Sequence, residues 1–105
     1  MGPYSIILST CKDFEEAKNV SLTLLKEKLA ACVSILPIHS FYFWKDDIEE
    51  SKEQLLIIKT AWKLNHKVEK CIREIHSYEV PEVLALKIEF GSKGYLNWLE
   101  ETIKH

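Results

Sequence analysis

The stretch CVSILPIHSFYFWKDD, residues 32–47, runs directly into IEESKEQLLIIKTAW, residues 48–62. Both stretches are rich in β-branched and aromatic residues, which favour strands. The Lys-Asp-Asp run between them supplies turn residues without a glycine. We therefore predict one long β-hairpin. Because Pro37 has no backbone N–H, the first arm should bulge or lie at a sheet edge there.

A strand and a helix are predicted before the hairpin. YSIILST, residues 4–10, is a compact apolar run of the kind that forms strands. Apolar residues then recur at helical spacing, with Asp13 as the expected N-cap and Glu16 as its reciprocal partner. We expect this helix to end around Ala30 or Ala31.

The pattern repeats after the hairpin. Residues 63–76 show helical spacing, residues 82–90 read as a strand, and residues 92–104 read as a short terminal helix. The order is that of a ferredoxin-like βαββαβ unit, an α+β fold with two helices on one face of an antiparallel sheet, plus a C-terminal helix. A chain of 105 residues suits a single domain. Residues 1–3, MGP, read as an expression scar or disordered start and receive no structural role.

The hairpin carries four consecutive aromatic residues, Phe41, Tyr42, Phe43 and Trp44. Neighbouring strand residues point to opposite faces, and the helices cover only one face. Two of the rings should therefore face solvent or a partner, as at a subunit interface. The alternative is that the C-terminal helix covers them. We expect the rings to form an oligomer interface.

Charge and cysteine content exclude several classes of protein. The formal net charge is −2, and Arg73 is the sole arginine, which argues against nucleic acid as a partner. The three cysteines, Cys11, Cys32 and Cys71, form no C-x-x-C pair, so they encode neither a zinc knuckle nor a redox dithiol. Scattered cysteines suit a reducing compartment. With no apolar run long enough for a signal peptide or membrane span, we expect a cytoplasmic protein without a membrane partner.

Five segments occur in an order that resembles the CutA family, the divalent-cation tolerance proteins. They are LAACVSILP, SFYFWK, IEESKEQLLIIKT, HSYEVPE and YLNWLEE, and the resemblance runs from about Ile6 to Leu99. It implies a tight homotrimer assembled through the long hairpin strands. It also implies a role in metal tolerance, with copper or another divalent cation as ligand. The resemblance places Cys32, Trp44, Lys59 and Tyr78 near an intersubunit cleft.

His76 is the first candidate metal ligand, because neutral imidazole is the commonest one in proteins. The alternative is a helix C-terminal histidine that interacts with the last carbonyls. Some CutA proteins are implicated in copper binding through a first-strand cysteine and a histidine pair. Those positions here are Ser9 and the pair Ile75-His76. Cys11 lies on the same strand face as Ser9 and is the expected substitute.

The segment HSYEVPE, residues 76–82, supplies the remaining candidates. Glu79 and Glu82 are either metal ligands or parts of a solvated loop, and Tyr78 is either a cleft residue or a core ring. Lys59 lies either at the wet end of its strand or in a polar cluster with one of the two glutamates. Pro81 enters the last strand and steers its predecessor to extended geometry, so the segment should be stiff.

We expect no enzymatic activity and no organic cofactor. The chain has no G-x-S-x-G and no glycine-rich phosphate loop. Acylphosphatases hold phosphate with an arginine after the first strand, whereas this loop, STCKDF at residues 9–14, has none. Two alternatives to metal binding stay open: a trimeric small-molecule sensor of the PII type that binds an anion in its cleft, and a purely structural trimer.

Overall fold

The computed structural model describes residues 3–104. In chain order the elements are β1 (Tyr4–Cys11), α1 (Phe14–Lys26), β2 (Cys32–Trp44), β3 (Asp47–Ala61), a 3₁₀ turn (Trp62–Leu64), α2 (Asn65–Ile75), β4 (Leu84–Ile88) and α3 (Lys93–Thr102). Residues 1–2 lie outside this range, so the expectation for them is not tested. Pro3 does take part in the fold, because its carbonyl accepts a hydrogen bond of 3.0 Å from the Trp62 N–H.

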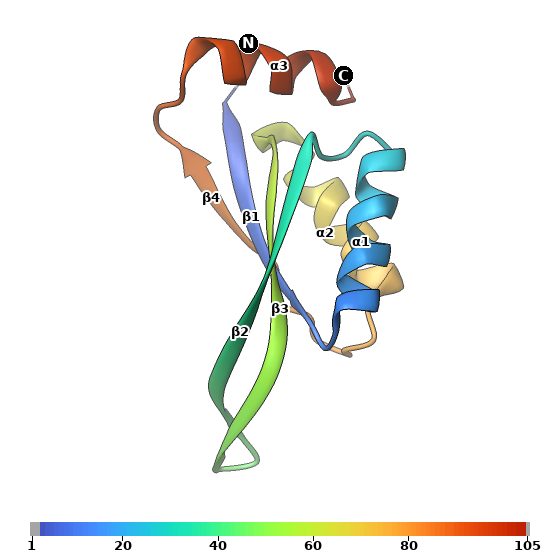
Figure 1. Cartoon of the computed structure of the whole chain (residues 1–105), viewed down its shortest axis with the longest axis vertical. Coiled ribbons are helices and arrows are strands. Elements are labelled where there is room, and N and C mark those ends of the chain that lie inside the picture. The colour runs from blue at the N-terminus through green and yellow to red at the C-terminus, as the bar shows by residue number, and fades with distance from the viewer. Residues whose placement is uncertain (1–2, 105) are drawn as a thin grey trace.

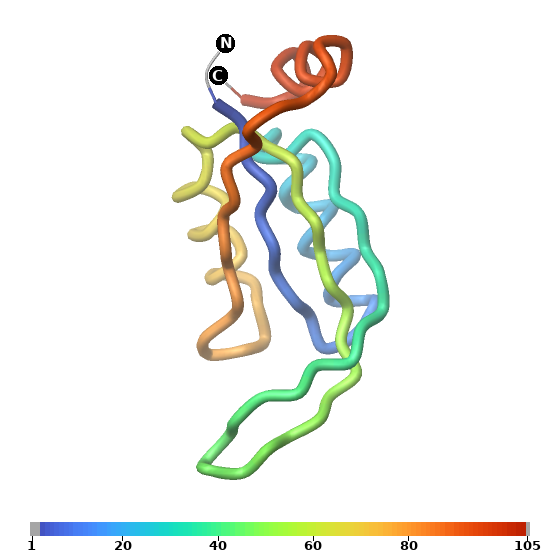
Figure 2. The backbone as a smooth tube through the Cα atoms, turned by 90° about the vertical axis from the view of Figure 1, so that its left-hand side faces the viewer, coloured from blue at the N-terminus to red at the C-terminus, as the bar shows by residue number. Residues whose placement is uncertain are grey.

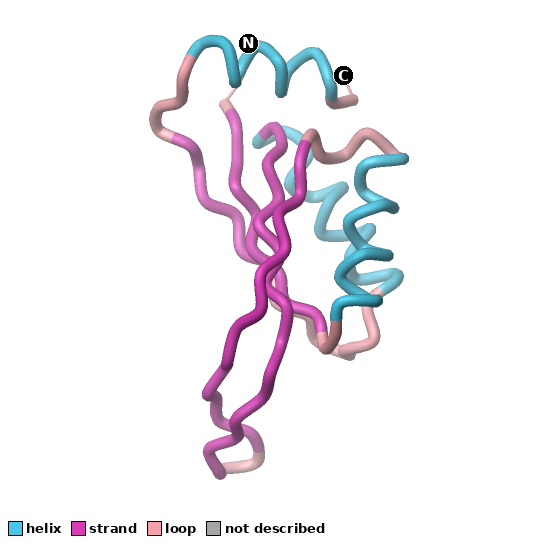
Figure 3. The backbone as a smooth tube through the Cα atoms, viewed as in Figure 1, coloured by secondary structure: helices cyan, strands magenta, loops and turns pink. Residues whose placement is uncertain are grey.

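The four strands form one antiparallel sheet in the order β2-β3-β1-β4, which confirms a mixed α+β fold. Helices α1 and α2 lie together on one side of the sheet, and α3 lies across the end where β1 begins (Figure 1). Figure 3 shows the long β2 and β3 strands twisting around each other as they leave the body of the molecule. No helix between residues 3 and 104 is both long enough and apolar enough to cross a bilayer.

The β2–β3 hairpin keeps one register throughout, from Cys32 opposite Lys59 to Trp44 opposite Asp47. Pro37 therefore causes no bulge. The proline is tolerated because β2 is an edge strand, which is the second of the two alternatives predicted for it. The turn residues Lys45 and Asp46 have φ values of 49° and 68°. Positive φ at both central residues is the type I′ geometry, whose twist matches that of the flanking strands.

The outer half of the hairpin projects beyond the helices (Figure 2). Phe41, Tyr42, Phe43 and Trp44 are 68%, 43%, 76% and 59% exposed. The expectation that the helices would cover one face of these strands is wrong for this segment, since neither face is covered there. The alternative cover is also wrong, because α3 lies at the opposite end of the sheet (Figure 1). We call residues 38–48 the hairpin arm.

The core lies between the sheet and the two packed helices. Its largest fully buried apolar side chains come from β1, β3, α1, α2 and α3: Ile7, Leu56, Ile58, Val20, Leu24, Val68, Ile72 and Leu99. Cys71 on α2 packs partly buried against this core. Cys11 is fully buried at the far end of β1.

Helix α1 ends at Lys26, four residues before the predicted end. The Leu29 N–H bonds to the Leu24 carbonyl at 2.9 Å, and the Lys28 N–H bonds to the Leu25 carbonyl at 3.0 Å. These are the two hydrogen bonds of a Schellman motif. Lys28 occupies the left-handed position, with φ 57°, where glycine is usual. A lysine there leaves no signal of a helix end in the sequence.

Lys28→Gly should raise the free energy of unfolding by about 0.5–1 kcal/mol, because glycine adopts positive φ without a Cβ penalty. The matched control is Lys26→Gly in the last helical turn, which should lower it by about 1 kcal/mol. Urea unfolding of the three proteins at pH 7 measures both changes. Equal destabilisation by the two glycines would contradict the left-handed geometry at Lys28.

Candidate metal centre

The His76 ring is held through both of its nitrogens at the end of α2. Its Nε2 lies 2.7 Å from the carbonyl oxygen of Thr10. A carbonyl only accepts hydrogen bonds, so Nε2 carries the proton. Its Nδ1 accepts a hydrogen bond of 3.0 Å from the Tyr78 backbone N–H. His76 is therefore a neutral imidazole with its proton on Nε2.

Glu16 connects α1 to the same loop. The Asp13 carboxylate accepts from the Glu16 N–H at 2.8 Å, which confirms the predicted N-cap. The predicted reciprocal bond, from the Asp13 N–H to the Glu16 carboxylate, is wrong. The Glu16 carboxylate accepts instead from the N–H groups of Lys12 at 3.2 Å and Ser77 at 2.8 Å. Glu16 therefore holds the loop after β1 against the loop after α2.

Tyr78 fixes the other side of the loop. Its hydroxyl donates a hydrogen bond of 2.7 Å to Glu53 on β3, and its ring lies 4.8 Å, centroid to centroid, from that of His76. Burial first, and then the Glu53 carboxylate, raise the pKa of Tyr78 well above its usual value. The hydroxyl therefore keeps its proton and ties the loop to β3, while the stiffness expected from Pro81 stays a prediction.

These contacts bring three potential metal ligands together: Cys11, Glu16 and His76. The Cys11 Sγ lies 3.8 Å from His76 Nε2, and the three ligand atoms all lie within 4.8 Å of one another. A tetrahedral ion with typical Zn–S and Zn–N bond lengths separates two such ligands by about 3.5 Å. The thiol and imidazole thus stand near the required separation, and the whole group needs to contract by about 1 Å.

The three groups differ in protonation. Burial raises the pKa of the Cys11 thiol to about 12, with the charges of Glu16, Asp13 and Glu53 adding to the effect. Burial also acts to raise the pKa of Glu16, but hydrogen bonds from Ser77 and Lys12 outweigh it, so that pKa lies below its usual value. At neutral pH the group therefore holds a protonated thiol and an ionised carboxylate, beside a His76 ring whose Nε2 donates to Thr10 and whose Nδ1 accepts from Tyr78.

The sequence predicted two members of this group and missed the third. Cys11 and His76 were candidates, whereas the spacing from Asp13 assigned Glu16 to the helix cap. Glu79 and Glu82 are exposed and do not join the group. Ser9, at the position where some CutA proteins have a cysteine, is fully buried, and its hydroxyl has no hydrogen-bond partner among residues 3–104.

The four predicted cleft residues do not meet within one chain. Cys32 and Lys59 face each other at the root of the hairpin, and Trp44 is next to its turn. Tyr78 contacts Glu53, six residues before Lys59, or about 20 Å along a strand. A cleft that contains all four residues therefore requires a neighbouring subunit, and it stays a prediction. Of the two alternatives for Lys59, the cluster with Glu79 or Glu82 does not form within one chain, where the Lys59 ammonium bonds to Ser34.

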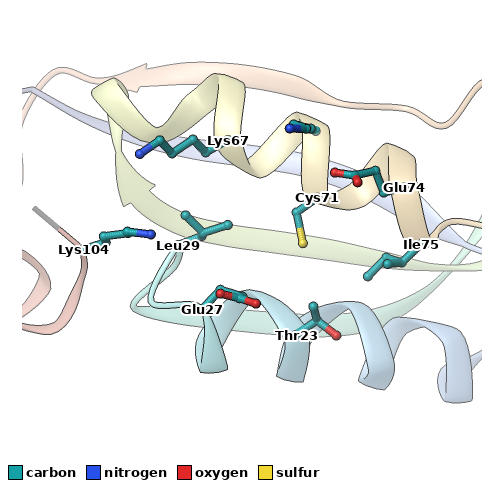
Figure 4. Close-up of a pocket in the computed structure, with 9 residues that line it drawn as sticks. Thr23, Glu27, Leu29, Lys67, Cys71, Glu74, Ile75 and Lys104 are labelled. Carbon is teal, nitrogen blue, oxygen red and sulfur yellow. The ribbon is translucent and has the colours of Figure 1, made fainter.

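A pocket of about 440 Å³ opens elsewhere, between α1 and α2. The Cys71 sulfur points into it, with Glu27 and Glu74 on its rim and Lys67 and Lys104 at one end (Figure 4). Burial first, and then the two carboxylates, raise the pKa of the Cys71 thiol. The pocket therefore holds a protonated thiol and charges of both signs, and it contains no member of the Cys11 group.

Comparison with known proteins identifies the family. Residues 5–102 match the family model described as CutA1 divalent ion tolerance protein. The divalent-cation tolerance protein CutA of Archaeoglobus fulgidus is 39% identical over 101 residues, which are 96% of this chain and 99% of that protein. Protein CutA of Mus musculus is 40% identical over 101 residues, 95% of this chain but 57% of the mouse protein.

Solved structures agree with these matches. The structure of the periplasmic divalent cation tolerance protein CutA from Archaeoglobus fulgidus superposes with a TM-score of 0.95 at 39% identity, covering 96% of this chain and 99% of that one. CutA1 from Oryza sativa superposes with a TM-score of 0.96 at 38% identity, covering 98% and 95%. The resemblance seen in the sequence is confirmed: this chain belongs to the CutA1 divalent ion tolerance family.

Proposed function

We propose that the protein binds a divalent transition-metal ion, copper in particular, through Cys11, Glu16 and His76, and that it acts in metal tolerance without catalysis. The observation that carries the proposal is the convergence of a sulfur, an oxygen and a nitrogen ligand within 4.8 Å. A thiol held protonated by its surroundings is a poor nucleophile, which suits a binding role better than a catalytic one.

The donor set favours a borderline transition metal. Imidazole suits copper and zinc, thiolate adds softness, and one carboxylate adds charge. To bind a divalent ion, Cys11 must release its proton, after which its thiolate and the Glu16 carboxylate together balance the two positive charges. The His76 proton must also move from Nε2 to Nδ1, so that the imidazole stays neutral, and the ring then loses both its hydrogen bond to Thr10 and the one it accepts from the Tyr78 N–H. Metal affinity should therefore be modest and should fall as the pH is lowered.

The proposed metal site is tested by copper titration with calorimetry at pH 7. Cys11→Ser, Glu16→Gln and His76→Ala should each weaken binding by roughly tenfold or more, since even outer-shell changes cost tenfold to a hundredfold. The matched control is the double variant Glu79→Gln, Glu82→Gln, which removes exposed carboxylates from the same loop and should bind as the parent does. At pH 5 the parent should bind more weakly, because protons compete for the thiolate and the imidazole.

Other results of the copper titration would contradict this assignment of the metal ligands. If the double variant loses copper while Glu16→Gln binds normally, the ion is held by the exposed loop. If all of the single variants bind copper as tightly as the parent, the Cys11 group holds the two loops together and does not bind the ion.

The metal-free protein offers a second test of Glu16. Its pKa is lowered in the folded state from 4.5, so its stabilisation is present above pH 4.5 and is lost as the pH falls through the lower folded value. Glu16→Gln should therefore be less stable than the parent at pH 7, and the gap should close below about pH 4.5. Thermal unfolding across pH 3–7 in the presence of a chelator measures the gap. A gap that stays constant over this range would mean that the carboxylate charge contributes nothing.

We further propose that the subunit is of the ferredoxin-like type, that it assembles as a homotrimer through the hairpin arm, and that the trimer is cytoplasmic. The strand order β2-β3-β1-β4 supports the topology. The four exposed aromatic residues support the assembly, because an uncovered apolar surface usually marks an interface. The three free cysteines support a reducing compartment.

Sedimentation equilibrium at micromolar concentration should give three times the chain mass of 12.3 kDa. The double variant Phe43→Ser, Trp44→Ser should sediment with a lower mass, because it removes two apolar side chains from the arm. Phe14→Ser is the control, since that ring is 52% exposed but lies on α1. A parent that sediments as a single chain, or a Phe14 variant that dissociates as readily as the arm variant, would overturn the proposed interface.

A further inference from the structure

Lys59 is a cation on a sheet face whose side chains around it are mostly apolar. The strand registers align Leu86, Ile6, Lys59 and Cys32 as one row across all four strands. The next residue along β3, Ile58, points the other way into the core beneath the helices and is fully buried. The row therefore lies on the open face, opposite α1 and α2. Apolar neighbours on this face come from every strand: Leu8, Leu36, Leu55, Ile57 and Leu84.

The contacts of Lys59 leave its charge unbalanced. Its ammonium donates to the Ser34 hydroxyl at 2.6 Å and lies 3.7 Å from the Cys32 sulfur. Among residues 3–104 no carboxylate lies within ion-pair distance of it. An ammonium has three protons, and one hydroxyl with one weak sulfur acceptor leaves at least one proton without a strong acceptor.

A tyrosine hydroxyl reaches the same place from α3. Tyr95 lies in the first turn of that helix, against the Cys32 sulfur. Burial first, and then this contact, raise the pKa of Tyr95, so its hydroxyl keeps its proton. The ammonium of Lys59 and the hydroxyl of Tyr95 thus both contact the Cys32 thiol, and the Ser34 hydroxyl joins them through its hydrogen bond with Lys59.

Covering the open face makes the charge costly. Any molecule that excludes water from these apolar side chains also removes water from the ammonium, and a buried charge is stable only when it is paired. One positive charge with two hydroxyl donors matches one carboxylate, which carries a single negative charge and two acceptor oxygens. We propose that Lys59, Ser34 and Tyr95 form a binding site for a single carboxylate group.

The carboxylate can come from two sources, which an experiment distinguishes. It belongs either to a small carboxylic acid anion from solution or to an acidic side chain of a second copy of this chain. The hairpin supplies such side chains, because Asp46 and Asp47 lie in the arm with its exposed rings and the exposed Glu49 and Glu50 follow on β3. Only the second source rests on the assembly proposed above. Neither involves the Cys11 group, which lies on the helix side of the sheet.

The test compares the parent with Lys59→Met and with Lys18→Met, a control on the exposed surface of α1. Thermal unfolding is measured in sodium acetate and in sodium chloride at equal ionic strength, and assembly is measured by sedimentation. If the carboxylate comes from solution, acetate should raise the melting temperature of the parent and of Lys18→Met more than that of Lys59→Met, with assembly unchanged. If it comes from a second copy, Lys59→Met should weaken assembly by roughly tenfold or more, and Lys59→Arg should restore part of the loss.

If Lys59 has no carboxylate partner, the methionine variant should have the opposite effect on assembly. Methionine then removes an unpaired charge from an apolar face, so Lys59→Met should assemble at least as tightly as the parent and respond equally to acetate and chloride. That result overturns the carboxylate site. The test of the carboxylate site is independent of the other proposals. A parent that sediments as a single chain refutes the trimer, whereas the comparison of acetate with chloride still tests the site. Copper titration of Lys59→Met should match the parent in either case.

Discussion

The unequal pairing on the two sides of β3 is the constraint on which the rest of the structure depends. β3 pairs with β2 from Asp47 to Lys59, but with β1 only from Gln54 to Ala61. Where both partners are present, helices can pack on the sheet and a core forms. Beyond that point two strands stand alone, and an isolated hairpin is marginal in water. The aromatic residues of the arm therefore lack a covering layer within the chain.

Local patterns in the sequence predicted most of the fold, and contacts between distant residues account for what it missed. The hairpin, the helices and the N-cap at Asp13 depend on spacing within a few residues, so they were readable. The left-handed conformation of Lys28 was not, because lysine carries no preference for it. Glu16 was assigned to the cap, since its second contact, with Ser77, joins segments 61 residues apart. The sequence left two alternatives open for Lys59, because its contact with Ser34 depends on strand register, which composition does not reveal.

The contacts that stiffen the His76 loop also oppose metal binding. In the metal-free chain the Glu16 carboxylate and both nitrogens of the His76 ring already have hydrogen-bond partners. An ion at the proposed site would gain ligand bonds, but the His76 ring would lose its hydrogen bonds with Thr10 and with the Tyr78 N–H, so the net affinity would be the difference between these energies. In the metal-free chain the loop is therefore held by its own hydrogen bonds and does not present free ligand atoms. Such coupling makes binding sensitive to pH and to any change that loosens the loop.

The distribution of the three thiols limits which metal one chain can select. Cys11 faces the helices, Cys32 lies on the open face beside Lys59, and Cys71 points into the pocket between α1 and α2. No two of them approach the same point, so a site built from residues 3–104 has at most one thiol ligand. Sites rich in sulfur select cuprous copper, whereas one thiolate with imidazole and carboxylate suits divalent copper or zinc. The Cys11 group proposed above would therefore favour a divalent ion, and a site with more sulfur would require thiols from more than one chain.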